Sequence, residues 1–266
     1  MKVVLFTGSH PRHLFVAETL LRHGFLSGVV LEKREDFMPT PSSGLMEIDR
    51  MNFIRHFADR DAAETRYFGH SRQLAMEPDA MLHVDYHTLN SNEVKDWVSA
   101  IRPDVVLTYG VHKISTELLE SFPEHRWNIH GGLSPWYRGN TTLFWPFYFM
   151  KPNWAGMTIH QLTAKLDGGA IVHHSVPELV RGDGLHDVAC RAVKQAAEDI
   201  VMILRKLDRG ESVQLLPQKS SGKLFMTEDW HPQHLRVVYN LFDNDIVDRF
   251  LDGEFGFHEP PLIKAF

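Results

Sequence analysis

The order of apolar runs at the start of the chain constrains the fold more than any other feature of the sequence. Residues 3–6 form a continuous apolar run that ends at a Thr-Gly-Ser turn, and a helical pattern then extends over residues 15–21. Residues 26–31 form a second apolar run. Uninterrupted apolar runs are typical of parallel strands covered on both faces by helices. The sequence therefore predicts an α/β fold with a Rossmann-like, doubly wound and mostly parallel sheet.

The rest of the chain predicts further elements of this fold and a change of character near its middle. We expect residues 34–79 to be mostly helix and loop, because Pro and Ser cluster near their start and the rest is polar. Residues 1–213 are predicted to form one domain, and residues 214–266 a small C-terminal subdomain or extension. Within the first domain we expect strands over 82–84, 105–109 and 127–130, helices over 91–101, 116–122 and 185–207, and a hairpin of 157–162 with 170–172.

Composition limits the partners of the chain. Its formal net charge of −6 gives no general attraction to nucleic acid. The single cysteine, Cys190, excludes an internal disulfide and fits a reducing compartment, and its helical spacing predicts a core thiol. The apolar runs are too short for a signal peptide or a membrane span. We therefore expect a cytoplasmic protein with no nucleic acid or membrane partner.

Two polar residues of the 127–130 strand are candidates for catalysis. Asn128 and His130 are two residues apart, so their side chains leave the same face of the strand. A loop beginning Gly131-Gly132 follows, at the end of a parallel strand where open α/β sheets bind ligands. Asp167 lies at the tip of the later hairpin, where it is either a turn residue or a partner of the histidine. We favour the second interpretation because of the strings that surround these residues.

Four strings in this order resemble the signature of the folate-dependent formyltransferases. That family includes glycinamide ribonucleotide transformylase, methionyl-tRNA formyltransferase and nucleotide-sugar N-formyltransferases. The resemblance extends over residues 103–172 and 1–31. The strings are Asn128-Ile129-His130, Ser134-Pro135-Trp136-Tyr137-Arg138-Gly139, Gly156-Met157-Thr158-Ile159-His160 and Leu166-Asp167-Gly168-Gly169-Ala170-Ile171.

The resemblance implies an enzyme of one-carbon metabolism that uses 10-formyltetrahydrofolate as its cofactor and forms tetrahydrofolate. It implies Asn128, His130 and Asp167 as the catalytic set. The chemistry of formyl transfer is consistent with this catalytic set, because amide and imidazole N–H groups can stabilise the charge that builds on the formyl oxygen when an amine attacks. Asp167 can orient His130, favour its protonated form and help to move the proton that the amine loses. No metal is needed.

The resemblance also implies which residues bind the two substrates. Gly131-Gly132 departs from the His-Pro-Ser sequence that family members often carry after the histidine, and we expect it to widen the acceptor pocket. Tyr137 and Arg138 are predicted either to cap a helix or to bind an anionic group. The cofactor is expected to contact Tyr109, Gly110, Val111, His112, Lys113, Ile114, Thr163 and Leu166, and the acceptor to contact Ser9, His10, Gly131, Gly132, Ser134, Tyr137 and Arg138.

Other conspicuous residues are expected to be structural. His173 and His174 are adjacent on a strand and point to opposite faces, so we expect structural or solvent-exposed roles and no metal site. Four aromatic residues are predicted to belong to the core rather than to a stacking platform. These are Trp145, Phe147, Tyr148 and Phe149.

The acceptor is the least constrained part of the prediction. A nucleotide-linked amino sugar is the leading candidate, because the chain has neither a clear basic patch nor the large C-terminal domain expected of a tRNA formyltransferase. Glycinamide ribonucleotide, an amino acid and a natural-product amine are alternatives. A folate-binding module without turnover is a further alternative, although the intact catalytic set argues against it. The aromatic-rich segment 225–257 suggests a homodimer contact.

Overall fold

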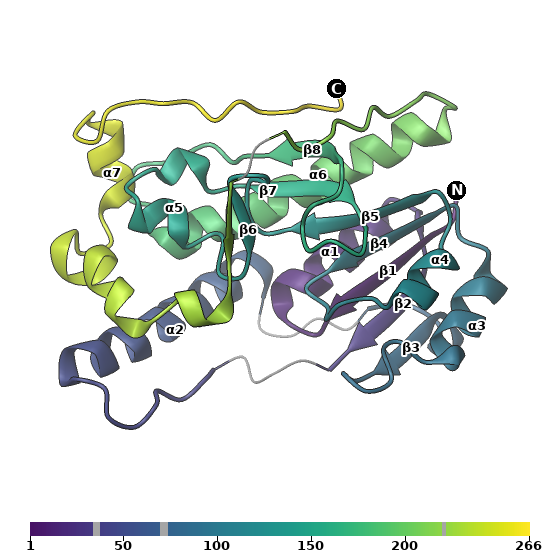
Figure 1. Cartoon of the computed structure of the whole chain (residues 1–266), viewed down its shortest axis with the longest axis horizontal. Helices are drawn as coiled ribbons and strands as arrows, with labels where there is room; N and C mark the ends of the chain where they lie inside the picture. Colours follow the sequence, from purple (N-terminus) through teal and green to yellow (C-terminus); the bar gives the residue numbers. More distant parts are fainter. Residues whose placement is uncertain (34–37, 70–73, 220–221) are drawn as a thin grey trace.

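A seven-stranded sheet forms the centre of the protein, in a computed structural model that describes residues 1–33, 38–69, 74–219 and 222–266. The strand order is β3-β2-β1-β4-β5-β7-β8 (Figure 1). Neighbours from β3 to β5 pair in parallel, and β7 and β8 continue the sheet as antiparallel strands. The predicted α/β fold is confirmed. The strands are β1 (Val3–Gly8), β2 (Leu26–Glu32), β3 (Met81–Val84), β4 (Val105–Tyr109), β5 (His125–His130), β7 (Met157–Gln161) and β8 (Ile171–Ser175).

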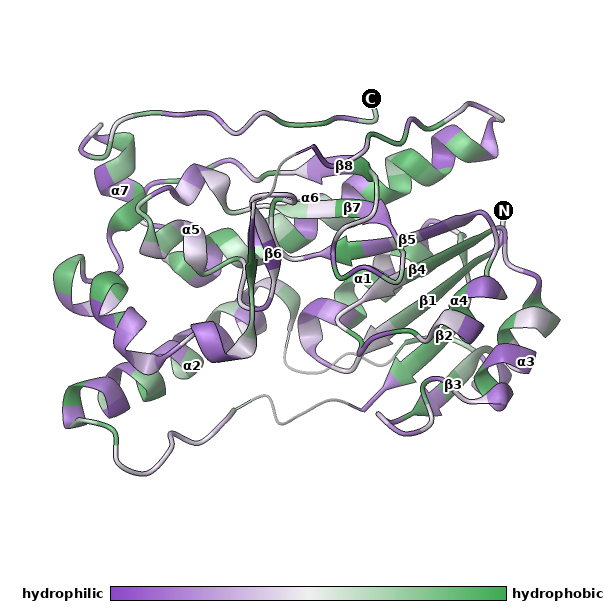
Figure 2. Cartoon of the chain, viewed as in Figure 1, coloured by the Kyte–Doolittle hydropathy of each residue, from purple (hydrophilic) through white to green (hydrophobic). Residues whose placement is uncertain are grey.

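The first strand shows why continuous apolar runs predicted a sheet covered on both faces. Every residue of β1 is buried. Val3 and Leu5 pack into one apolar core, whereas Val4 and Phe6 pack into another on the opposite face. Figure 2 shows the same apolar character along β1, β2 and β4. A strand that alternated apolar and polar residues could not have filled both cores.

Helices cover the two faces of the sheet. The first core contains residues of α1 (Pro11–Arg22) and α6 (Leu185–Asp208), and the second contains residues of α3 (Asn92–Ile101) and α4 (Thr116–Glu120). Ser91 and Ser115 accept hydrogen bonds from the first turns of α3 and α4, which fixes where these two helices begin. These helix positions agree with the sequence prediction to within a few residues.

The segment 34–79 contains one long helix, α2 (Glu47–Phe68), and the expectation of helix and loop is correct for its described part. Residues 34–37 and 70–73 lie outside the described residues. Helix α2 packs against α1 and α6. Its C-terminal half thereby reaches the same region as the ends of the central strands.

The residues after 213 pack onto the rest of the chain. Strand β9 (Lys223–Phe225) pairs in parallel with the short strand β6 (Tyr137–Gly139). Residues on either side of position 213 share an aromatic-rich core, to which α5 (Trp145–Tyr148) and α7 (Ile246–Leu251) contribute. A boundary at residue 213 stays a prediction.

The last residues of the chain run along the outer edge of β8 (Figure 1). The backbone N–H of His174 donates to the carbonyl of Ile263 at 2.8 Å, and the N–H of Ile263 donates to His174 Nδ1 at 2.9 Å. The N–H of Ala265 donates to His173 Nδ1, and the ring of Phe266 stacks on His173. These contacts tie the C-terminal segment to the edge strand of the sheet.

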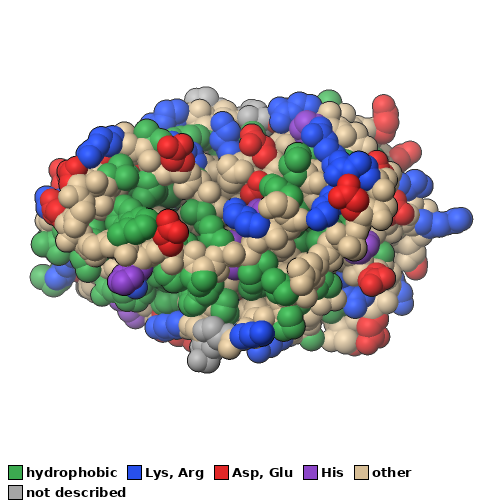
Figure 3. Space-filling model, turned by 90° about the horizontal axis from the view of Figure 1, so that it is seen from above, with side chains coloured by type: hydrophobic (Ala, Val, Ile, Leu, Met, Phe, Trp, Pro, Cys, Tyr) green, Lys and Arg blue, Asp and Glu red, His purple; other side chains and the backbone are tan. Residues whose placement is uncertain are grey.

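The face of the molecule on which this segment lies carries grouped hydrophobic side chains together with scattered charges of both signs (Figure 3). Among the described residues, no helix is both long and apolar enough to cross a membrane.

Candidate active site

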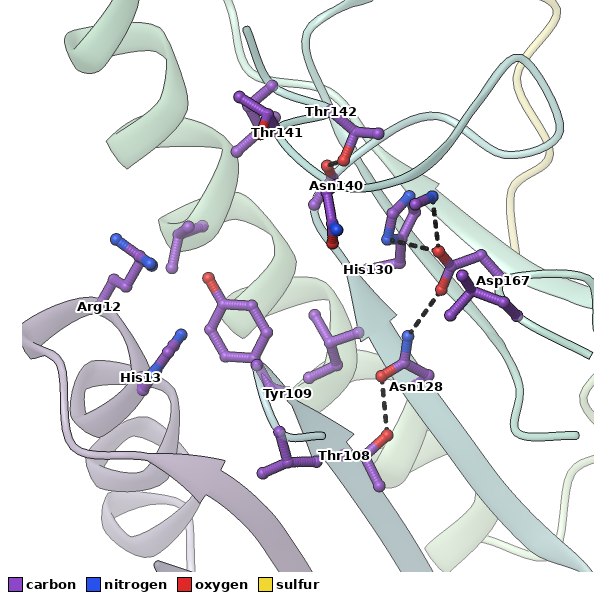
Figure 4. Close-up of a pocket in the computed structure, with 18 of the residues that line it drawn as sticks. Arg12, His13, Thr108, Tyr109, Asn128, His130, Asn140, Thr141, Thr142 and Asp167 are labelled. Carbon is purple, nitrogen blue, oxygen red and sulfur yellow. Dashed lines mark hydrogen bonds and ion pairs between the residues drawn. The ribbon is translucent and has the colours of Figure 1, made fainter. Parts of the chain in front are cut away.

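A cavity of about 480 Å³ opens at the carboxyl ends of β4 and β5, within the usual size range for small-molecule sites. Its walls come from these strands, from the loops that follow β4, β5 and β7, and from α1, α2 and α6. The cavity brings Asn128, His130 and Asp167 together on one wall (Figure 4). It therefore lies where open parallel sheets bind their ligands.

Asn128 is held in one orientation by a neighbouring strand. Thr108 on β4 donates its hydroxyl hydrogen to Asn128 Oδ1 at 2.7 Å. The amide nitrogen must then face the other way, and it lies 3.4 Å from Asp167 Oδ1. The Asn128 amide N–H groups are consequently presented to the cavity wall that also carries Asp167.

Asp167 is the residue on which the polar contacts of the site converge. Its backbone has φ of +43°, a left-handed conformation that Asp tolerates better than most residues, and Gln218 donates to its carbonyl at 2.8 Å. The backbone N–H of Gly139 donates to Asp167 Oδ2 at 2.8 Å, and His130 Nδ1 lies 3.5 Å from the same oxygen. Burial alone would raise the pKa of Asp167. The nearby His130 and His160 and the Gly139 N–H outweigh it and hold the pKa well below its usual value, so Asp167 is ionised.

The ring of His130 is held by a hydrogen bond at one nitrogen, and its other nitrogen faces Asp167. Its Nε2 lies 2.9 Å from the carbonyl of Tyr137, and because a carbonyl only accepts, Nε2 carries a hydrogen. In the protonated ring Nδ1 carries the second hydrogen, and its 3.5 Å distance to Asp167 is too long for a normal hydrogen bond. Burial lowers the pKa of His130, while the charge of Asp167 opposes that effect. A protonated His130 therefore has one N–H available to an incoming oxygen.

His160 is a further polar group of the site. It belongs to one of the four sequence strings, but no role was predicted for it. It lies opposite Asn128 in the β5–β7 pairing, and its Nε2 is 3.2 Å from Asn128 Nδ2 and 3.4 Å from Asp167 Oδ1. Its Nδ1 faces the carbonyl of Gln161 at 2.9 Å. Period-two alternation on an antiparallel strand that pairs with β5 was the signal that could have assigned it to the site.

The two glycines after His130 differ in their surroundings. Gly131 lines the cavity, and a Cβ there would make ordinary contacts at 3.6 Å with Leu143. A Cβ on Gly132 would lie 2.6 Å from the Tyr137 carbonyl and 2.8 Å from His130 Nε2. The expectation that both glycines widen the pocket is wrong at Gly132, because the space beside it is already filled by the groups that hold His130.

All eight residues expected to contact the cofactor line the cavity. The loop after β4 is held by Glu32, which accepts the backbone N–H of His112 at 2.9 Å and lies 2.6 Å from its Nδ1. Leu166 is 50% exposed although it lines the cavity, so it has an apolar surface to offer a ligand. Those eight residues are Tyr109, Gly110, Val111, His112, Lys113, Ile114, Thr163 and Leu166.

Most residues expected to contact the acceptor lie elsewhere. Tyr137 is buried and stacks on Phe225, while Arg138 donates to the carbonyl of Gly222 at 2.9 Å. Ser134 is fully buried. Gly131 does line the cavity, but Ser9, His10, Gly132, Ser134, Tyr137 and Arg138 do not.

The structure instead places residues of α1, α2 and α6 in the cavity wall. Arg12 and His13 lie across the cavity from His130 and Asp167 (Figure 4). Glu64, from α2, binds Arg12 through an ion pair. Nothing in the local sequence of α2 indicated this position, because it depends on how that helix docks against α1 and α6.

The other conspicuous side chains are mostly structural. Cys190 is buried as expected, although it also reaches the cavity wall, and burial raises the pKa of its thiol. Trp145 and Phe147 belong to the core, whereas Phe149 is exposed, so the core prediction is wrong for Phe149. His173 and His174 are both completely buried. Of the two roles expected for these histidines, the structural one is correct.

His173 and His174 each use both ring nitrogens within the protein. His173 accepts from Ala265 through Nδ1 and lies 3.1 Å from Asp199 Oδ2 through Nε2. His174 accepts from Ile263 and donates to the carbonyl of Ser134 at 2.8 Å. Burial lowers the pKa of His174 to about 4, so its ring is neutral near pH 7.

Comparison with known proteins adds two findings to this geometry. A family model described as formyl transferase matches residues 58–204. Solved structures with the same fold include a sugar N-formyltransferase from a Shewanella species, with 13% identity, a TM-score of 0.56 and coverage of 90% of this chain and 87% of that one. A phosphoribosylglycinamide formyltransferase from Anaplasma phagocytophilum has 14% identity, a TM-score of 0.54 and coverage of 85% and 98%.

A third solved structure contains ligands. The formyltransferase PseJ from Anoxybacillus kamchatkensis, in complex with UDP-4,6-dideoxy-4-formamido-L-AltNAc and tetrahydrofolate, has 16% identity to this chain and a TM-score of 0.51. The match covers 92% of this chain and 96% of that one. At these levels of identity the three likenesses establish the fold.

Proposed function

The chain belongs to the formyl transferase family, and from that premise we propose that it transfers the formyl group of 10-formyltetrahydrofolate to the amine of a small acceptor. The observation that carries the proposal is the convergence of Asn128, His130 and Asp167 on one wall of the cavity. The neighbouring loop 109–114 and the segment 163–166 supply the expected cofactor surface.

The lining of the cavity suits the chemistry of the cofactor. It has backbone polar groups along the loop after β4 and apolar side chains from Val111, Ile114, Leu162 and Leu166. Such a wall suits a flat ring with polar edges. When bound, the cofactor supplies a formyl group on a weakly basic nitrogen, which is a good leaving group.

The residues of the site have separate tasks in this reaction. Asn128 and protonated His130 direct N–H groups toward the oxygen of the reacting carbonyl, where negative charge develops. As the new C–N bond forms, the amine loses a proton, which the ionised Asp167 beside both donors would take up. The folate nitrogen would take up a proton as its bond to the formyl carbon breaks, so that tetrahydrofolate is released. Thr108 and the Tyr137 carbonyl keep Asn128 and His130 aligned before the acceptor arrives. Donors held in this way need little reorganisation during the reaction.

A nucleotide-linked amino sugar is our first candidate for the acceptor. Support comes from the fold shared with a sugar N-formyltransferase and with PseJ, whose complex contains a UDP-linked formamido sugar. Glycinamide ribonucleotide is the second candidate, because a phosphoribosylglycinamide formyltransferase has the same fold and a comparable TM-score. Amino acids and natural-product amines complete the range of acceptors to be tested.

The test is acceptor-dependent release of tetrahydrofolate. The protein is incubated with 10-formyltetrahydrofolate and, in turn, a UDP-linked 4-amino-4,6-dideoxyhexose, glycinamide ribonucleotide and individual amino acids. We expect one of these amines to yield tetrahydrofolate and a formamide product detected by mass spectrometry. Cofactor binding in calorimetry without release of tetrahydrofolate in the presence of any amine would instead identify a folate-binding module.

We also propose the compartment and the assembly state from the chain itself. The net charge of −6 and the cavity support a small-molecule partner and no nucleic acid partner, and the single, buried cysteine supports a reducing compartment such as the cytoplasm. Leu241 and Phe257 are 66% and 64% exposed in the segment 225–257, and such apolar surface supports a homodimer contact there. Light scattering during size-exclusion chromatography measures the molar mass of the protein in solution and so distinguishes a homodimer from a monomer.

A further inference from the structure

The cavity has a second polar wall whose groups the formyl-transfer mechanism does not use. It consists of Arg12 from α1, His56, Arg60 and Glu64 from α2, and His186 from α6, and we refer to these five residues as the recognition wall. The three α2 residues are four apart, so they share one face of the helix. Arg12 lies across the cavity from His130 and Asp167 (Figure 4). The recognition wall therefore faces the part of a ligand remote from the reacting carbon.

Glu64 is the first unusual group of the recognition wall. The residue is 3% exposed, and its Oε1 accepts a hydrogen bond from Arg12. Its other carboxylate oxygen, Oε2, is buried and has no hydrogen-bond partner in the described part of the chain. Buried carboxylate oxygens nearly always have a partner, because leaving one without a donor is costly. An acceptor atom of this kind in a cavity wall is suited to a donor on a ligand.

His186 is the second such group. Its ring packs against the ring of His56 on α2, with 4.5 Å between the ring centroids. Nε2 is buried and, within the described ranges, has no hydrogen-bond partner. Burial and the charges of Arg60 and Arg12 lower the pKa of His186 to about 3, so the ring is neutral at pH 7 and Nε2 either accepts or donates one hydrogen bond.

We propose that Glu64 Oε2 and His186 Nε2 bind hydroxyl groups of the amine acceptor, and that these two residues thereby select among the candidate acceptors by their hydroxyl groups. Glu64 Oε2 is a hydrogen-bond acceptor, so it is complementary to an O–H donor and not to a phosphate or carboxylate oxygen, and a hydroxyl group can pair with a neutral imidazole nitrogen in either tautomer. An apolar amine would leave both atoms buried without a partner. The inference deepens the proposed function and rests on it, since it assumes that the cavity holds an amine acceptor.

The test compares substrates and variants in the same assay. The acceptors are a UDP-linked 4-amino-4,6-dideoxyhexose and glycinamide ribonucleotide, each paired with an analogue in which one ring hydroxyl is replaced by hydrogen. The variant Glu64→Gln removes the charge while keeping the shape of the side chain. The control variant Asp61→Asn removes the same charge from an exposed position of α2.

We expect Glu64→Gln to raise the KM for the hydroxylated acceptor by about tenfold or more, because a hydrogen bond to a charged group is lost. The kcat and the KM for 10-formyltetrahydrofolate should change by less than about twofold, and Asp61→Asn should behave as wild type. For one of the deoxy analogues, the wild-type protein should show the same increase in KM, and Glu64→Gln should add little to it. Calorimetric titration of each acceptor into protein saturated with an unreactive folate analogue should give parallel changes in Kd.

Two outcomes have different meanings. Absence of turnover with every amine would overturn the proposed function and this inference with it. Turnover by wild type that is equally efficient with all the deoxy analogues, or that is unchanged in Glu64→Gln, would overturn this inference alone. The comparison of analogues on wild type needs no variant, so it remains decisive even if Glu64→Gln folds poorly.

Discussion

Replacing Asp167 by Asn tests the electrostatic core of the proposed mechanism. The amide keeps the size of the side chain and can still accept the Gly139 N–H, but it removes the negative charge 3.5 Å from His130 Nδ1. Catalysis by a protonated His130 requires that its rate fall as pH rises past the His130 pKa. Removing an adjacent anion lowers a histidine pKa, so the variant should lose activity at a lower pH than wild type.

The size of this effect can be worked out from the geometry. Two unit charges at 3.5 Å interact by about 5 kcal/mol at an effective dielectric constant of about 20. That interaction corresponds to an upper bound of about 3.5 pKa units, and opposite charges at this range usually shift a pKa by about one to three units. Burial already holds the pKa of His130 below its ordinary value, so pH 7.5 lies above it in both proteins. The protonated fraction, and with it kcat, should fall about 10- to 1000-fold at pH 7.5.

The assay is a pH–rate profile of tetrahydrofolate release for both proteins, with melting temperature as a control for folding. Asp199→Asn is the matched control, because Asp199 forms a buried pair with His173 away from the cavity. It should leave the pH–rate profile unmoved even if it lowers the melting temperature. An Asp167→Asn protein with wild-type kcat and an unchanged profile would refute the reasoning and leave Asp167 as a turn residue.

Other parts of the site give further expectations. Gly132→Ala should reduce kcat at least about tenfold and lower the free energy of unfolding by about 1–3 kcal/mol, because its Cβ would displace the groups that hold His130. The control Gly131→Ala should be close to wild type in turnover and in denaturant unfolding. Asn128→Ala should lower kcat about a hundredfold with little change in folate affinity by calorimetry, and a near-normal kcat would exclude it as a transition-state donor. A non-reactive folate analogue should protect the backbone amides of residues 109–114 and 163–167 from hydrogen exchange, and protection confined to the C-terminal segment would place the cofactor elsewhere.

The sheet could be predicted from the sequence because the pattern that marks each strand lies within a few consecutive residues. Each central strand is a short apolar run, and its burial on both faces follows from the absence of alternation, as β1 and β4 show. The positions of the hairpin and of α6 followed from turn residues and helical spacing in the same way. Less could be said about α2, since its amphipathic pattern is weak and its face is decided by packing against α1 and α6.

The residues of the candidate site also fall into two groups, those that local sequence predicts and those that depend on tertiary packing. Asn128 and His130 could be placed together because strand geometry relates residues two apart, and the surrounding strings extended the argument to Asp167. Glu64 and His186 could not be found, because they come from helices far apart in sequence that meet only in the folded protein. The prediction for Gly132 was wrong for a related reason: the space beside a glycine depends on distant atoms, here the Tyr137 carbonyl.

The C-terminal segment along β8 also affects how the protein can be handled. Strand β8 is the last strand of the sheet, and an uncovered edge offers unpaired backbone groups to strands of other molecules. Residues 263–266 occupy part of that edge through the contacts with His173 and His174. A shortened version of the chain without these residues should aggregate more readily at high concentration, while its cavity remains intact. An affinity tag is therefore better placed at the N-terminus when the protein is produced for crystallisation.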